Sequence, residues 1–145
     1  MKLLPIEKEL EDNAKFASDT LCMGTLPMTI DFFKRIGYVP PWIGYFAQLN
    51  GKIVGSAAFK GQPINGKVEI AYGTMEPFQN QGIGTKICRA LAELSLKTDP
   101  SVKITARTLP ENNYSTKVLK KNNFVWLGTV YDPEDGIVWE WEYRA

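Results

Sequence analysis

The sequence contains no histidine, and only two of its 145 residues are cysteines, Cys22 and Cys88. Without histidine there is no Ser-His-Asp triad, no Cys-His protease centre and no histidine-ligated zinc site. Two isolated cysteines cannot supply a four-thiolate zinc site or a dense disulfide framework, so we expect two reduced thiols. We therefore expect no metal, and chemistry based on carboxylates, hydroxyls, amines, backbone groups or a bound cofactor.

The chain also lacks a charge excess and a long apolar run. Its 17 basic and 16 acidic residues give a net charge of +1, so electrostatics favour neither nucleic acid nor an anionic membrane as partner. No apolar run approaches the roughly 20 residues of a membrane span, and the apolar start is too short for a signal peptide. By default we expect one cytoplasmic domain over residues 1–145.

Periodicity and turn signals predict a mixed α+β order of elements. Helices are predicted over residues 7–18, 27–36, 82–98 and 112–122. Strands are predicted over residues 42–49, 52–59, 67–75, 101–108, 124–131 and 137–143. Asn50-Gly51 and Asn65-Gly66 are strong hairpin signals, because both turn positions accept a positive φ, so the first three strands are predicted to form an antiparallel meander. In the first helix, Leu10, Ala14 and Ala17 are predicted to face inward.

The clearest functional signal is a loop between a strand and a helix, at residues 79–84, which read QNQGIG. Amides in the first turn of a helix have no intrahelical partner, and the helix dipole adds positive charge there, which favours phosphate binding. Gly82 and Gly84 lack Cβ atoms that would hinder a pyrophosphate, and Thr85 adds a hydroxyl donor. The spacing fits neither the P-loop nor the dinucleotide fingerprint. An ordinary strand-to-helix turn is the alternative interpretation.

Three further segments, taken with this loop, resemble the GNAT acyltransferases, in particular the branch with N-terminal protein and antibiotic acetyltransferases. The loop itself is similar to the family's Q/R-x-x-G-x-G/A pyrophosphate loop. Residues 69–72, EIAY, resemble its E-I-G-Y strand, and residues 111–115 (ENNYS) and 118–124 (VLKKNNF) resemble its E-N-x-x-S and V-L-x-K-x-G-F segments. The resemblance implies a single-domain GNAT fold with a mixed, mostly antiparallel sheet of about six to seven strands and about four helices.

This resemblance also implies an N-acetyltransferase that passes the acetyl group of acetyl-CoA, its co-substrate, to a primary amine by direct attack in a ternary complex. The backbone of residues 73–75 would pair with the pantetheine arm, and the Met75 N–H would point at the thioester oxygen. The pyrophosphate would lie on the amides of residues 81–85. The implied cofactor-binding residues are Thr74, Met75, Gln79, Gln81, Gly82, Ile83, Gly84, Thr85, Asn112 and Ser115.

The attacking amine is protonated at neutral pH, so the reaction needs a base or a proton path. Glu69 is the preferred base, acting directly or through water, since on a strand its side chain shares a face with Gly73 and Met75. The alternative interpretation is that Glu69 is a strand residue paired with a lysine such as Lys52.

The tyrosine general acid of many family members aligns with Leu119. Tyr72 or Ser115 would then substitute, with Tyr72 as the second candidate catalytic residue, or the thiolate would leave unprotonated. This departure leaves two other hypotheses open, a non-catalytic acyl-CoA-binding sensor and an interaction domain on the same fold.

The acceptor is not identified by the sequence, and a small-molecule amine and a protein amine both remain open. Residues 24–41 are where we expect the acceptor wall. We expect no nucleic-acid or membrane partner. A late exposed strand such as residues 137–143 would allow a homodimer.

Overall fold

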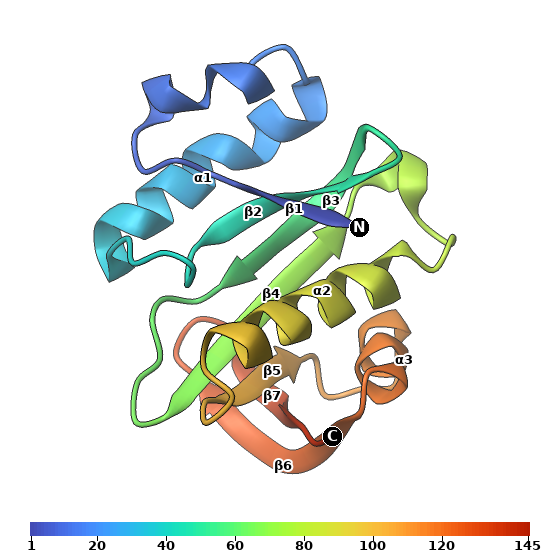
Figure 1. Cartoon of the computed structure of the whole chain (residues 1–145). Helices are drawn as coiled ribbons and strands as arrows, with labels where there is room; N and C mark the ends of the chain where they lie inside the picture. Colours follow the sequence, from blue (N-terminus) through green and yellow to red (C-terminus); the bar gives the residue numbers. More distant parts are fainter.

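One seven-stranded sheet organises the chain, and the computed structural model describes all of residues 1–145 (Figure 1). The strands are β1 (Lys2–Pro5), β2 (Gly44–Leu49), β3 (Lys52–Phe59), β4 (Lys67–Thr74), β5 (Lys103–Thr108), β6 (Phe124–Asp132) and β7 (Gly136–Tyr143). Their order is β1-β2-β3-β4-β5-β7-β6. The expectation that residues 137–143 form an exposed strand for dimer pairing is wrong, because β7 pairs with β5 and β6 and the edge strand is β6. Every neighbouring pair is antiparallel except β4 and β5, which are parallel. The predicted mixed, mostly antiparallel α+β sheet is confirmed.

Helices cover both faces of the sheet (Figure 1). They are α1 (Thr20–Ile36), α2 (Ile83–Thr98) and α3 (Tyr114–Lys121), with two short 3-10 helices, η1 (Leu10–Phe16) and η2 (Glu76–Phe78). A Cβ on Gly44 of β2 would lie 3.0 Å from Thr29 of α1, so Gly44 and its register partner Ala58 face α1. Gly55 is three residues from Ala58 and so faces the other way, where a Cβ would lie 2.7 Å from Ile87 of α2.

The two Asn-Gly turns form as predicted. Asn50 and Gly51 have φ angles of 52° and 79°, and Asn65 and Gly66 have φ angles of 53° and 74°. All four residues lie in the left-handed region that a primed two-residue turn requires. The β2–β3–β4 meander is therefore confirmed, together with the later helices and strands to within a few residues.

The N-terminal segment differs from the sequence prediction. A helix over residues 7–18 was expected, but the chain first forms strand β1, which pairs with β2, and then the short η1. Three residues predicted to face the core are exposed: Leu10, Ala14 and Ala17. Asn13 and Phe16 are buried in their place.

The side chain of Asn13 explains this local structure. Its Oδ1 accepts from the Glu7 N–H at 2.8 Å, and its Nδ2 donates to the carbonyls of Glu7 and Glu9 at 3.1 and 2.9 Å. These bonds satisfy backbone groups without α-helical pairing, which is how asparagine competes with a helix. The period of the apolar residues could not reveal this buried amide.

Helix α1 begins seven residues earlier than predicted, at Thr20 instead of Pro27. The Asp19 carboxylate caps it by accepting from the amides of Leu21 and Cys22 at 2.9 and 3.4 Å. Pro27 lies inside the helix because the apolar face is strong enough to continue past the missing donor. The predicted end at Gly37, with φ 94°, is confirmed. None of the helices combines the length and the apolar character that a membrane crossing needs.

Replacing Gly55 by alanine tests the close packing of β3, β4 and α2. A Cβ at Gly55 would lie 2.4 Å from the Gly73 carbonyl oxygen and 2.7 Å from Ile87. We expect Gly55→Ala to lower the free energy of unfolding by about 1–3 kcal/mol, as overpacking does. Gly24→Ala in α1 is the matched control: nothing lies within 4 Å of its Cβ. It should raise stability by about 0.5–1 kcal/mol. Denaturant unfolding measures both, and equal effects would contradict the packing.

Candidate active site

Strand β4 loses its β5 partner halfway along its length. The register between β4 and β5 runs from Lys67 to Ile70, whereas the register between β4 and β3 continues to Thr74. Beyond Ile70 the edge of β4 that faces β5 therefore has no strand partner. Unpaired backbone groups at such an edge can bind an extended ligand by strand-like hydrogen bonds.

Alternation along β4 determines which backbone groups face this open edge. The Met75 N–H donates to the Val54 carbonyl at 2.9 Å, so Met75 and Gly73 direct their backbone groups toward β3. Tyr72 and Thr74 consequently direct theirs to the open edge. The expectation that the Met75 amide is free to point at a thioester oxygen is therefore wrong, because that amide belongs to the β3–β4 ladder.

Helix α2 begins without a cap, unlike the other two α-helices. Asp19 caps α1, and a capping box of Asn113 and Thr116 caps α3. The N-cap of α2 is Gly82, with a φ of 74° and no side-chain hydrogen bond. None of the amides of residues 81–85 donates a backbone hydrogen bond within the protein. The donors of this first turn, reinforced by the helix dipole, form a site suited to an anion such as phosphate.

A cleft of about 340 Å³ joins the open edge of β4 to the start of α2. Its lining residues are Tyr72, Gly73, Thr74, Gln79, Asn80, Gly84, Tyr114 and Ser115. The Thr74 Oγ1 is buried there without a hydrogen-bond partner. A buried polar group of this kind costs roughly 1–3 kcal/mol unless something pairs with it. The cleft is therefore chemically suited to a polar ligand with a phosphate at one end.

The predicted cofactor-binding residues are divided between the cleft and its surroundings. Thr74, Gln79, Gly84 and Ser115 line it. Gln81, Gly82, Ile83 and Thr85 contribute the free amides of the α2 start, and the Ile83 side chain is buried in the core. Asn112 is exposed and does not line the cleft. The next residue, Asn113, forms the α3 cap.

Tyr114 and Asn80 line the cleft but were not among the predicted site residues, although Asn80 lies within the QNQGIG loop. A Cβ on Gly84 would lie 2.8 Å from the Tyr114 hydroxyl and 3.4 Å from Thr74 Oγ1. The small size of Gly84 thus allows α2 and α3 to approach each other, whereas the sequence analysis assigned it to the approach of a pyrophosphate. The position of Tyr114 directly before Ser115, inside the ENNYS segment, was the signal that could have identified it.

The two predicted catalytic residues lie on opposite faces of β4. Glu69 is two residues from Ala71, which is paired with Ala58, so its side chain lies on the face of α1. Tyr72 lies on the α2 face near Cys88, where burial raises its pKa and keeps the hydroxyl protonated. Burial also raises the pKa of Cys88 to about 12, so this thiol is not a nucleophile at neutral pH.

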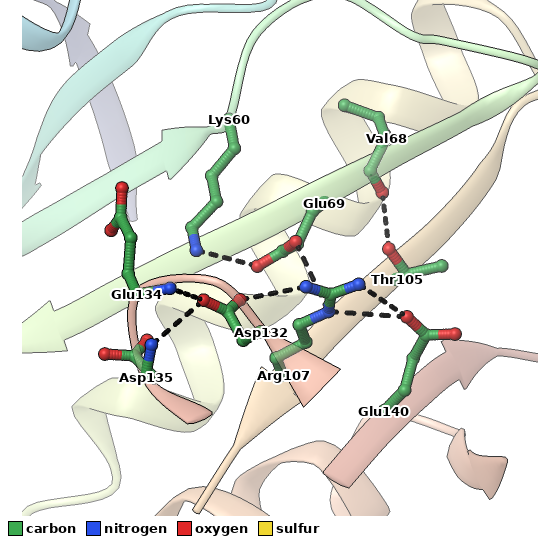
Figure 2. A network of polar contacts seen from close by, with 9 residues as sticks. All are labelled: Lys60, Val68, Glu69, Thr105, Arg107, Asp132, Glu134, Asp135 and Glu140. Atoms are coloured by element: carbon green, nitrogen blue, oxygen red, sulfur yellow. Dashed lines mark hydrogen bonds and ion pairs between the residues drawn. The ribbon is translucent and has the colours of Figure 1, made fainter. Parts of the chain in front are cut away.

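Glu69 is held by two cations. Its carboxylate lies 2.8 Å from Lys60 Nζ and 3.8 Å from Arg107 Nε, as Figure 2 shows. The interpretation of Glu69 as an ion-paired strand residue is therefore correct, although the lysine is Lys60 and not Lys52. If Glu69 acts as a base, it does so while paired with Lys60 and Arg107.

Arg107 connects Glu69 to the turn between β6 and β7 (Figure 2). Its Nη1 donates to Asp132 Oδ2 at 2.8 Å, and its Nη2 lies 3.4 Å from Glu140. Asp132 Oδ1 accepts from the amides of Glu134 and Asp135 at 2.8 and 3.1 Å. The two turn amides, followed by Arg107, lower the pKa of Asp132 to about 2.

Comparisons with known proteins agree with this geometry. The model of the acetyltransferase (GNAT) domain matches residues 5–125. No curated protein sequence gives a significant match. The aminoglycoside acetyltransferase AAC(6')-Ib in complex with coenzyme A is 30% identical, with a TM-score of 0.60, over 69% of this chain. That alignment spans 64% of the AAC(6')-Ib chain.

Two other solved structures match over nearly the whole chain. AAC(6')-Ib in complex with acetyl-CoA is 23% identical, with a TM-score of 0.69, over 98% of this chain and 92% of that chain. RimL, a ribosomal L7/L12 alpha-N-protein acetyltransferase, in complex with coenzyme A is 17% identical, with a TM-score of 0.68, over 97% and 91%. At these identities the likeness concerns the fold, and it confirms the GNAT fold expected from the sequence.

The Arg107–Asp132 pair predicts an acid-sensitive stability. Because the pKa of folded Asp132 is depressed, its contribution is complete above the ordinary aspartate pKa and is lost as the pH falls from about 4 toward 2. Asp132→Asn keeps an oxygen for the turn amides but removes the charge. It should be less stable at neutral pH and lose less stability between pH 4 and pH 2. Asp135→Asn, in the same turn and exposed, is the control. Identical acid profiles for Asp132→Asn and the wild type, measured by thermal unfolding, would contradict this prediction.

Proposed function

Because the chain belongs to the GNAT acetyltransferase family, we propose that it transfers the acetyl group of acetyl-CoA, its co-substrate, to a primary amine. The observation that carries this proposal is the meeting of two unsatisfied backbone surfaces in one cleft. These are the uncapped first turn of α2 and the open edge of β4. A ligand with a diphosphate and an amide-containing arm complements both.

In this proposal the amides of residues 81–85 bind the pyrophosphate. The backbone groups of Tyr72 and the Thr74 N–H pair with the pantetheine arm, while the Thr74 carbonyl accepts from Gln79 Nε2 at 3.2 Å. The Thr74 hydroxyl gains the partner that it lacks. When bound, acetyl-CoA supplies a thioester that an amine can attack. Tyr114 and Ser115, at the start of α3, form one wall of the cleft.

Direct attack by the amine in a ternary complex is supported by the absence of a competent nucleophile on the protein. The chain has no histidine to activate a hydroxyl or a thiol. Burial raises the pKa of both cysteine thiols, Cys22 and Cys88, to about 12. A covalent acyl-enzyme therefore has no suitable residue on which to form.

We assign proton removal from the amine to Glu69, acting through water. Glu69 lies on the α1 face of β4, two residues before Ala71, at the side of the strand opposite α2. The position of the family's usual tyrosine is occupied by Leu119, which is buried and carries no hydroxyl. The hydroxyls of Tyr72, Tyr114 and Ser115 line the cleft instead and can donate to the departing sulfur.

A cytoplasmic location also remains part of the proposal. Cys22 and Cys88 are both free and buried, which suits a chain that folds under reducing conditions. The acceptor of the acetyl group is a separate question.

A new negative charge in the first turn of α2 tests the phosphate site. Thr85 is the third residue of this helix, where an acidic side chain favours the helix dipole. We expect Thr85→Asp to keep or slightly raise the thermal stability while weakening acetyl-CoA binding at least tenfold by charge repulsion. Calorimetry measures the affinity.

The matched control is Thr20→Asp, which places the same charge at the exposed start of α1. It should leave acetyl-CoA affinity unchanged. Unaltered affinity in Thr85→Asp would place the pyrophosphate elsewhere, and Gln81→Glu, on an exposed residue beside it, repeats the test if Thr85→Asp folds poorly.

Glu69→Gln separates a base from a structural ion pair. We expect kcat to fall about tenfold or more, in line with general base catalysis, with the KM for acetyl-CoA unchanged. Activity should recover at alkaline pH, where the amine loses its proton without help. Free-thiol release with the best acceptor of an amine panel measures the rate.

Glu140→Gln is the control, since Glu140 contacts the same guanidinium at 3.4 Å from another strand. It should retain wild-type kcat despite the loss of its ion pair with Arg107. Equal rate losses in the two variants, or none in either, would remove Glu69 as the base.

A further inference from the structure

We propose that the acceptor is a monoamine attached to a compact apolar group, which binds between α1 and the sheet. This inference rests on the proposed acetyl transfer and names the class of amine that the transfer leaves open. Three features of a cavity between α1 and the sheet support it: the floor of the cavity, its lining and its charge.

The floor of the cavity is a trough of small side chains. Gly44, Ala58 and Ala71 are register partners across β2, β3 and β4. Ser56 and Gly73 form the next row toward the end of β4. Because side chains on one face of a sheet stand side by side, these residues leave a depression that larger residues would fill.

The cavity above this floor has a volume of about 300 Å³. Three of its large lining side chains are apolar and come from α1, namely Met28, Phe32 and Phe33, and its large charged side chains are Arg35 and Lys60. This volume is at the lower end of small-molecule sites, and aromatic walls favour an aliphatic or aromatic group. A large polyhydroxylated ligand would fill the space poorly and leave its hydroxyls unpaired.

A second hollow of about 220 Å³ adjoins this cavity and reaches β4 residues that also line the cleft on the other side of the strand. It shares Ala58 and Ala71 with the apolar cavity, and it shares Tyr72 and Gly73 with the cleft. An amine whose apolar group lies between α1 and the sheet can therefore extend its nitrogen past Gly73 toward the acetyl donor.

The charges around the cavity do not favour a polycation. Its charged lining residues are one acid, Asp31, and two bases, Arg35 and Lys60. Arg35 lies 3.9 Å from Asp31 and 4.0 Å from Glu134, and Lys60 lies 2.8 Å from the Glu69 carboxylate. The Glu69 carboxylate is thus closely paired, and the one lining acid, Asp31, is outnumbered by two bases. A polyamine would bring several positive charges into a site whose lining has no excess of negative charge.

An acceptor panel tests this inference. Acetyl-CoA affinity is first measured by calorimetry, and free-thiol release is then followed with 2-phenylethylamine, isopentylamine, spermidine and kanamycin as acceptors. We expect a kcat/KM for 2-phenylethylamine at least tenfold above that for spermidine or kanamycin. Calorimetric titration of 2-phenylethylamine into the protein with coenzyme A present should show binding, and spermidine should show none.

Ala71→Leu places a larger side chain on the trough floor. The KM for 2-phenylethylamine should rise at least tenfold, with acetyl-CoA affinity unchanged. Ala58→Leu repeats the test if Ala71→Leu is unstable, and Ala14→Leu, at an exposed position in η1, is the control that should change neither value.

The outcomes separate this inference from the proposed function. Preference for spermidine or kanamycin, no turnover of apolar amines by a protein that binds acetyl-CoA, or an unchanged KM in both trough variants would overturn the inference alone. Failure to bind millimolar acetyl-CoA would overturn the proposed function and the inference together.

Discussion

The separation of β4 from β5 beyond Ile70 is the feature on which the rest of the site depends. A backbone amide or carbonyl inside a protein needs a partner, and a sheet normally supplies it. At Tyr72 and Thr74 the sheet supplies no partner on one edge, and only the Thr74 carbonyl is paired there, by the Gln79 side chain. A few residues later the first amides of α2 have no cap. Because these groups converge on one cleft, the unsatisfied hydrogen bonding of the fold is concentrated where an extended, phosphate-bearing ligand can use it.

Polar contacts hold the elements on both sides of the point where β4 and β5 separate. Arg107 lies on β5 one residue beyond the last β4–β5 register pair, and it contacts Glu69, Asp132 and Glu140. On the other side of the sheet, Asn122 Nδ2 donates to the Thr85 carbonyl at 3.1 Å and so ties the end of α3 to the first turn of α2. The Thr85 carbonyl is held by a side chain while the amides of the same turn remain free. The site is thus preorganised by residues that need not touch a ligand.

Local signals in the sequence predicted much of this architecture. They could not predict the contacts that depend on the register between strands. The Asn-Gly turns and the QNQGIG loop act within a few residues, so the meander and the start of α2 followed from the sequence. Whether Lys52 or Lys60 meets Glu69 depends on the pairing of β3 with β4, in which Phe59 is opposite Ile70. The same pairing engages the Met75 amide, a contact that no motif encodes. Tyr114 enters the cleft because α3 packs on α2, which is a tertiary contact.

Gly73 of β4 lines both the cleft and the hollow on the α1 face. It does not have a positive φ, and a Cβ there would meet only Ser56 Oγ, at an ordinary contact distance of 3.7 Å. The backbone and the packing would therefore accept a side chain at this position. That side chain would point to the α1 face, into the hollow that adjoins the apolar cavity. Since the fold itself does not require glycine at residue 73, what the missing side chain provides is open space in this hollow, beside β4 residues that also line the cleft.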